Sequence, residues 1–151
     1  MSRDIYSTLV YARTKPIIGR FAYYLLKILG IEIPRSVRIG YDIELVHGGL
    51  GVVIHSRTVI GDRVKVYPGV TVGRADIYLP IERSHFEGVV IEDDVILCPG
   101  CKVLCRQGVM RLGRGSVVGA NAVLFDSTGE NEIWAGVPAR LVSHRDEHDE
   151  A

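Results

Sequence analysis

The 151-residue sequence predicts a mainly β protein, a parallel β-helix of hexapeptide repeats with a short helical segment at its N-terminus. Three observations predict this fold. Aliphatic residues recur every six positions, small or aliphatic residues stand two positions before them, and glycine often follows them. Residues i and i−2 of a strand point to the same face, so both columns are expected to fill one core. Glycine allows a sharp corner after each short strand, and three such hexads close one triangular coil.

The two columns run through most of the chain. The first column comprises Ile33, Ile39, Leu45, Ile54, Ile60, Val66, Val72, Ile91, Leu97, Val103, Leu112, Val118 and Leu124. The second comprises Val37, Ile43, Val52, Thr58, Val64, Val70, Val89, Val95, Cys101, Met110, Ser116 and Ala122. A β-sandwich would show turn signals every ~8–12 residues without a fixed register, so the constant period argues against it.

The overall composition limits the class of protein. The length fits one domain, the formal net charge is zero, and aromatic residues make up only 7% of the chain, which suits a thin aliphatic core. A neutral chain gives no reason to expect nucleic acid as a partner. Three closely spaced cysteines argue against a disulfide framework and favour a reducing compartment. The N-terminus lacks a signal-peptide pattern, so we expect a soluble, cytoplasmic protein.

Residues 1–30 are expected to form a helical cap. Apolar residues at helical spacing predict a helix that begins near Pro16 and ends at Gly30, preceded by a shorter helix over residues 3–12. These helices would cover the strand edges of the open first coil. The alternative is a membrane-surface helix, because basic residues stand among aromatic ones. The basic residues are Arg13, Lys15, Arg20 and Lys27. We expect the cap, without membrane contact.

The register breaks at three places within the predicted β-helix, which spans residues 31–142. Three extra residues, His47-Gly48-Gly49, form the first break. Residues 73–88 lack the repeat and are expected to project as a loop, and a third break lies in "LCRQGVMR". Residues 143–151 form a charged tail that is expected to be flexible. Interruptions of a solenoid are where function tends to concentrate.

The repeats, together with "VIGDRVKVYPGVTVG" and the closing "WAGVPARLV", identify a family. The sequence resembles the hexapeptide-repeat acyltransferases, most closely the serine acetyltransferase type, and is also similar to sugar and polysaccharide O-acetyltransferases. The resemblance implies coils that wind left-handed, acetyl-coenzyme A (acetyl-CoA) as acetyl donor, and a homotrimer with its active sites between subunits.

His47 is the first candidate for catalysis. In the family a histidine at this insertion removes the proton from the acceptor hydroxyl as it attacks the acetyl thioester, and a neutral imidazole suits that task. The alternative is a corner histidine that stabilises a turn. The resemblance also implies that Glu32, fifteen residues earlier, orients His47 where the family has an aspartate. Glu44 stands beside the inward-pointing Leu45 and should face solvent.

A second histidine is implied on the projecting loop. The family carries an Asp-Arg-His-Pro sequence there, and "IERSHFEG" offers Arg83 and His85 as counterparts, although the register is imperfect and the proline is missing. Arg83 would contact an anionic or polar part of the substrate. The alternative for His85 is an ordinary exposed loop residue. His55 follows the inward-pointing Ile54 at a corner and is expected to be structural.

The resemblance also places the acetyl donor. Its pantetheine arm would lie along a groove between neighbouring solenoids, against corner backbone groups. The matching residues are Cys98, Gly100, Gly119, Ala120, Pro138 and Arg140, with Arg140 near a phosphate. No metal is expected, because the side chains of Cys98, Cys101 and Cys105 should diverge and the histidines lack the spacing of the gamma-type carbonic anhydrases.

The acceptor is where the sequence departs from its relatives. Serine acetyltransferases carry an acidic residue directly before the catalytic histidine, to hold the serine ammonium, and a long N-terminal helical domain. Here that position is Val46, and about thirty residues precede the β-helix. A buried ammonium needs a countercharge, so we expect a saccharide or another neutral hydroxyl acceptor. Serine O-acetylation and a non-catalytic trimeric scaffold are the alternatives.

Overall fold

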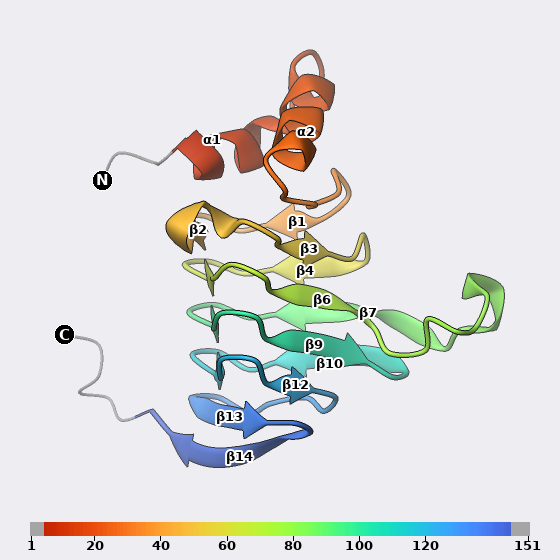
Figure 1. Ribbon diagram of the computed structural model, residues 1–151, viewed down its shortest axis with the longest axis vertical. Coiled ribbons are helices and arrows are strands. Elements are labelled where there is room, and N and C mark those ends of the chain that lie inside the picture. Colours follow the sequence, from red (N-terminus) through yellow and green to blue (C-terminus); the bar gives the residue numbers. More distant parts are fainter. Residues whose placement is uncertain (1–4, 146–151) are drawn as a thin grey trace.

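A computed structural model describes residues 5–145 of the chain, and Figure 1 shows a stack of triangular coils with two helices at one end. Each coil contributes one short strand to each of three faces. The first face holds β1 (Arg38–Ile39), β4 (Thr58–Ile60), β7 (Phe86–Ile91) and β10 (Gly108–Leu112). The second holds β2 (Glu44–Leu45), β5 (Lys65–Val66), β8 (Ile96–Leu97), β11 (Val117–Val118), β13 (Glu132–Gly136) and β14 (Ala139–His144). The third holds β3 (Val53–Ile54), β6 (Thr71–Arg74), β9 (Lys102–Cys105) and β12 (Val123–Leu124).

The strand register follows the two sequence columns. All strand pairs are parallel except β13 with β14. On the third face Ile54 pairs with Val72, which pairs with Val103, although the chain between these rungs differs in length. Both columns are buried in one core, and only Ile39 is half-buried. The hexad pattern therefore specifies the core, and the extra residues leave it undisturbed.

The N-terminal cap consists of α1 (Ile5–Ala12) and α2 (Gly19–Ile28), which lie over the first coil in Figure 1. Val10 and Leu26 are part of one buried core with the coil residues, and Ala22 is also buried. The second helix begins at Gly19 rather than near Pro16, because residues 13–18 form a turn. A Cβ at position 19 would lie 2.4 Å from the Arg13 carbonyl oxygen, so this turn fits only against glycine.

Arg13, one of the basic residues that suggest the membrane-surface alternative, is buried. Its guanidinium donates hydrogen bonds to the carbonyl oxygens of Val10, Pro34 and Val37. Burial lowers the pKa of Arg13 to about 10, which leaves it cationic at neutral pH. The side chain thus ties the end of α1 to the first coil through backbone carbonyl groups.

The C-terminal end is closed by the antiparallel pair β13–β14. Ser143 and His144, expected in a flexible tail, pair with Ile133 and Glu132 instead. The rest of that tail, residues 146–151 with His148, lies outside the described residues. None of the helices within residues 5–145 is long and apolar enough to cross a membrane.

Candidate active site

His47 lies on the edge between the second and third faces, which we call the His47 edge. The chain turns here at residues 46–52, 67–70, 98–101 and 119–122. Successive turns are joined by backbone hydrogen bonds, from Gly69 N to Leu50 O (2.9 Å), Gly100 N to Pro68 O (2.9 Å) and Asn121 N to Pro99 O (2.9 Å). The turns therefore form one continuous column below His47.

Glycines make this column smooth. Gly69 and Gly100 have positive φ angles of 74° and 71°, which favour glycine. A Cβ at Gly69 would lie 3.5 Å from the Gly100 Cα atom, and one at Gly100 would lie 2.1 Å from Asn121 Oδ1. The closely stacked backbone at Gly69 and Gly100, where no side chain stands, is open to the approach of an extended ligand.

The insertion carrying His47 is a short helical turn, Val46–Gly49, with left-handed backbone inside it. His47 has φ 52° and ψ 31°, and Gly48 has φ 79° and ψ 0°. Three consecutive residues, His47, Gly48 and Gly49, have positive φ angles and turn the chain out of the coil and back, and the His47 side chain is exposed. Its ring stands edge-on to Tyr67 of the next rung, with the centroids 6.4 Å apart. The imidazole therefore lies at the surface of the His47 edge, beside an aromatic ring.

The N-terminal cap contacts the insertion through Tyr6. A Cβ at Gly48 would lie 2.9 Å from Cζ and 3.3 Å from the hydroxyl oxygen of Tyr6, so the Tyr6 phenol packs directly on this glycine. Sequence reasoning missed Tyr6, because no periodicity relates a residue of α1 to the insertion. It also explains Gly48, since any side chain there would collide with the phenol.

Glu32 stands one rung above β3, as its spacing from His47 predicts. Its backbone bridges to Val53 and its N–H donates to Val52 O at 2.8 Å. The Glu32 carboxylate pairs with Lys27 of α2 at 3.4 Å, and this contact raises the pKa of Lys27. No contact joins Glu32 to His47 among the described residues, so the orienting role of Glu32 stays a prediction.

The other carboxylate near the insertion is Glu44. It is exposed, as expected from its place beside Leu45, and pairs with Lys65 at 3.7 Å. Val46, directly before His47, is half-buried. Both Glu32 and Glu44 thus already have lysine partners within the chain.

His85 and Arg83 lie elsewhere. The edge between the third and first faces, which we call the loop edge, carries the turns at residues 55–57, 75–85, 106–107 and 125–127. The loop of residues 75–85 projects from it in Figure 1 and contains the short helix Ile81–Arg83. His85 is exposed at its end, where its carbonyl accepts a hydrogen bond from Gly108 N at 2.7 Å. Within one chain, His85 and His47 occupy different edges of the prism.

His55 has a structural environment on the loop edge, in line with its expected role. Its ring packs edge-on against Phe86 with centroids 4.7 Å apart, and its Nδ1 accepts a hydrogen bond from Arg57 N at 3.1 Å. Burial, with the charges of Arg57 and Arg74, lowers the pKa of His55. The ring is therefore held neutral at the base of the projecting loop.

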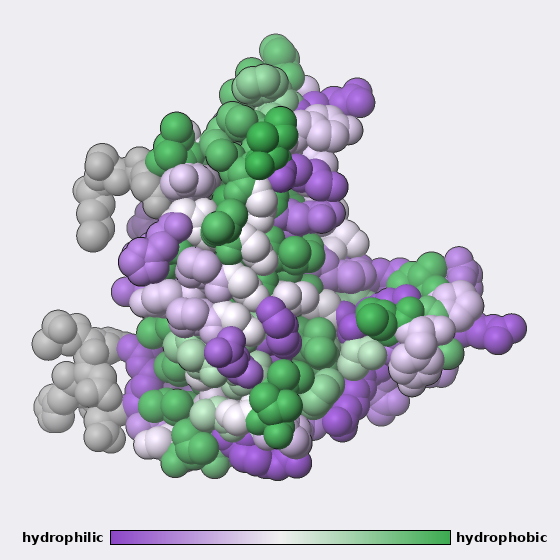
Figure 2. Space-filling model, viewed as in Figure 1, coloured by the Kyte–Doolittle hydropathy of each residue, from purple (hydrophilic) through white to green (hydrophobic). Residues whose placement is uncertain are grey.

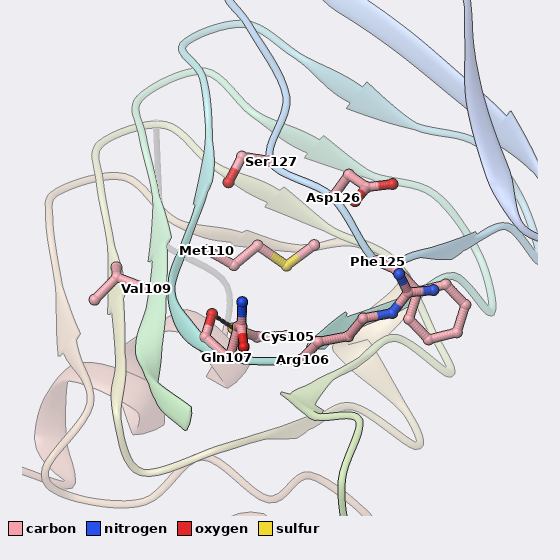
Figure 3. A pocket seen from close by; sticks show the side chains of 8 residues that line it. All are labelled: Cys105, Arg106, Gln107, Val109, Met110, Phe125, Asp126 and Ser127. Carbon is pink, nitrogen blue, oxygen red and sulfur yellow. Dashed lines mark hydrogen bonds between the residues drawn. The ribbon is translucent and has the colours of Figure 1, made fainter. Parts of the chain in front are cut away.

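A cavity of about 460 Å³ opens on the loop edge, at the third break in the repeat. Figure 3 shows Asp126 and Ser127 on one side of it and Arg106 and Gln107 on the other, with Met110 between. Arg106 stacks on the Phe125 ring, 4.5 Å from its centroid. The sequence locates this interruption but not its cavity. The cavity forms between residues 105–110 and residues 125–127, which follow each other on neighbouring rungs.

The residues implied for the acetyl donor follow the His47 edge. Cys98 is half-buried, and burial raises the pKa of its thiol. The turn residues Gly100, Gly119 and Ala120 continue the column, and Gly119 N donates to Trp134 O at 2.8 Å. Pro138 and Arg140 are exposed in and after the next turn. The six residues are Cys98, Gly100, Gly119, Ala120, Pro138 and Arg140.

No three His, Cys, Asp or Glu side chains within residues 5–145 are placed together to hold a metal ion. Cys101 points into the core, where burial raises its pKa to about 12. Cys105 is buried beside the loop-edge cavity, and burial raises its pKa too. Both thiols are protonated at neutral pH and poor ligands.

Comparison with known proteins gives a consistent relationship. No protein-family model matches the chain. A serine acetyltransferase of Bacillus licheniformis is 33% identical over 134 residues, which cover 88% of this chain and 58% of the relative. A Brucella abortus serine acetyltransferase solved in complex with coenzyme A is 25% identical, with a TM-score of 0.71 over 93% of this chain and 54% of that one. Soybean serine acetyltransferase is 27% identical, with a TM-score of 0.69 over 89% and 52%.

These matches confirm the predicted fold class, a left-handed β-helix of hexapeptide repeats. They also confirm the predicted resemblance to serine acetyltransferases. The chain spans about half the length of the relatives it matches. The matched relatives are named for serine, which does not support the saccharide acceptor predicted from Val46.

Proposed function

Because the chain is a serine acetyltransferase-like protein of the hexapeptide-repeat β-helix type, we propose that it transfers the acetyl group of acetyl-CoA to the hydroxyl of serine. One observation carries the proposal. His47 stands exposed on a left-handed turn at the head of a glycine-lined edge, at the insertion where the sequence predicts the general base.

In the proposed reaction His47 takes the proton of the acceptor hydroxyl while the oxygen attacks the thioester carbonyl. The C–S bond breaks, and the thiolate of coenzyme A leaves and takes up a proton. The products are the acetyl ester and free coenzyme A. A positioned imidazole contributes about 10²–10⁴-fold to such a step. Tyr6 and Tyr67 flank the turn and would limit the freedom of the His47 ring.

Acetyl-CoA would lie along the His47 edge. The missing side chains at Gly69 and Gly100 would let the pantetheine arm approach backbone groups of these turns. The relative solved with coenzyme A supports this substrate. Arg140, exposed beyond the lowest turn, would then meet a phosphate group of the nucleotide.

Serine is the favoured acceptor because the relatives are serine acetyltransferases. The earlier expectation of a saccharide rested on Val46 and on the length of the N-terminal segment. The second argument fails, because a chain that spans half of its relatives says nothing about what lies beyond it. Only Val46 still favours a neutral hydroxyl acceptor, since it places an apolar group where the family has a carboxylate for the ammonium.

The site is proposed to be completed by a second copy of the chain. His85 and Arg83 lie on the loop edge, apart from His47, so a homotrimer that packs the loop edge of one subunit against the His47 edge of the next would join them. Arg83, in this arrangement, would contact an anionic part of a substrate.

A thiol-release assay with acetyl-CoA tests the proposal, with serine, other amino acids, sugars and nucleotide sugars as acceptors. We expect turnover with serine and a loss of about 10²–10⁴-fold for His47→Ala at unchanged melting temperature. His144→Ala, which removes an exposed histidine of β14, is the control and should keep full activity. Full activity of His47→Ala would refute the mechanism. Absence of coenzyme A binding by calorimetry would favour the scaffold alternative, and turnover with sugars alone would restore the saccharide reading of Val46.

A further inference from the structure

The N-terminal helix α2 has two apolar faces, and the β-helix covers only one of them. Leu26 belongs to the buried core that the coils share, and Ala22 on the same side of the helix is also buried. On the other side stand three large apolar residues at helical spacing, and a fourth, Ile17, lies in the turn before the helix. They are Ile17 (90% exposed), Phe21 (72%), Tyr24 (56%) and Ile28 (82%). Capping the coil explains the first face and leaves the second, which we call the outer stripe, without a function.

The surface around the outer stripe is cationic. Residues 5–31 contain four basic side chains and no Asp or Glu. Arg13 is buried and Lys27 is paired with Glu32, which leaves Lys15 and Arg20 exposed. Arg35 joins them, since its Nη2 atom lies 3.3 Å from a Cβ built at Gly19. Among the described residues, these three cations form no ion pair.

Contrary to the expectation from the sequence of a cap without membrane contact, we propose that the outer stripe docks this end of the molecule on an anionic membrane surface. Apolar and aromatic residues on one side of a helix, with cations beside them, are what an interfacial helix requires. The helix is already folded and anchored in the core by Leu26, so binding needs no ordering of the chain. The stripe lies at the end of the coil stack that carries the helices, where Figure 2 shows apolar residues gathered.

The charges favour a lipid surface over a second copy of the chain. A two-fold contact of this face with itself would bring Lys15, Arg20 and Arg35 of one copy against the same cations of the other. Anionic headgroups instead attract each cation near the surface. The proposal concerns a surface away from His47, so it stands or falls separately from the acetyl transfer.

Vesicle co-sedimentation of the full chain tests the proposal. The vesicles are phosphatidylcholine alone, or phosphatidylcholine mixed with an equal amount of phosphatidylglycerol. We expect partitioning at least ~10-fold stronger to the anionic vesicles, weakened by high salt. The double substitution Phe21→Ser and Ile28→Ser should reduce it by ~10-fold or more, and Arg20→Glu by a smaller factor.

The matched control is the double substitution Ile77→Ser and Tyr78→Ser on the projecting loop. These residues are as exposed as the stripe (77% and 81%) but lie on another part of the molecule, so vesicle binding should persist. Circular dichroism and thiol release show that the stripe variant remains folded and active. Equal binding to both kinds of vesicle, or an equal loss in the loop variant, overturns the proposal. A lower mass of the stripe variant by light scattering overturns it too, and assigns the face to contact between copies.

Discussion

The His47 edge and the loop edge both receive residues that the six-residue period does not provide for, and they accommodate them differently. On the His47 edge three consecutive residues with positive φ angles return the chain to its column at once, and Gly69 and Gly100 stack in the turns below. On the loop edge residues 75–85 project outward, and the break at 106–107 leaves a cavity. The His47 edge holds one imidazole at a fixed position. The loop edge offers side chains on a protrusion, suited to reach another molecule.

The largest effect is expected from two variants, one with a substitution on the His47 edge and the other with a substitution on the loop edge. His47→Ala and His85→Ala should each lose about 10²-fold or more in turnover if both histidines serve the reaction. If the site joins the His47 edge of one subunit to the loop edge of the next, mixed trimers of the two variants regain intact sites. After unfolding and joint refolding in equal amounts, random assembly restores about one quarter of the sites.

The measurement is thiol release by the co-refolded mixture, compared with each variant refolded alone. Activity that stays at the level of the single variants would mean that both histidines act within one chain or that His85 has no role in the site. A mixture assembled without prior unfolding is the control, because intact oligomers should exchange subunits slowly.

A smaller effect should decide what Glu32 does. If Glu32 orients His47, Glu32→Gln lowers kcat by about 10–100-fold and alters the pH profile, whereas Lys27→Met leaves both unchanged. If the carboxylate only pairs with Lys27, the two variants behave alike. Each then loses little or no stability, as expected for an exposed ion pair screened by solvent. Steady-state kinetics across pH and chemical denaturation separate the two outcomes.

The contrast between the edges also explains which features of the structure could be predicted from the sequence. Both core columns and all three interruptions were visible as spacing, because the buried side chains impose the period. Tyr6 and the cavity could not be anticipated, since they depend on where helices and breaks lie around the core. The ion pair of Glu32 with Lys27 could not be anticipated either, because Lys27 lies in the cap and no repeat register relates it to the coil.

The rigidity of the His47 edge can be compared directly with the openness of the loop edge. Gly100 and Gly108 both have positive φ angles, 71° and 62°. A Cβ at Gly100 would lie 2.1 Å from Asn121 Oδ1, whereas one at Gly108 meets nothing within 4 Å. Both alanine variants incur ~1–2 kcal/mol of backbone strain, and Gly100→Ala should cost ~1 kcal/mol more because the Asn121 side chain must move. Denaturant titration measures the free energy of unfolding of both variants. Equal values for Gly100→Ala and Gly108→Ala would show that the Asn121 side chain moves aside without cost.

The smallest expected effect concerns the base of the projecting loop. The pKa of His55 lies below its ordinary value of 6.5 because burial and the charges of Arg57 and Arg74 disfavour the imidazolium. As pH falls through 6.5 the unfolded chain therefore binds a proton before the folded chain does, and the free energy of unfolding decreases. His55→Asn keeps an acceptor for Arg57 N without a titrating group, so it should lose less stability than the wild type between pH 7 and pH 5. Thermal melts across this range should differ by less than ~4 °C, and a parallel decline of both proteins would mean that the ring does not stay neutral against Phe86 as the loop folds.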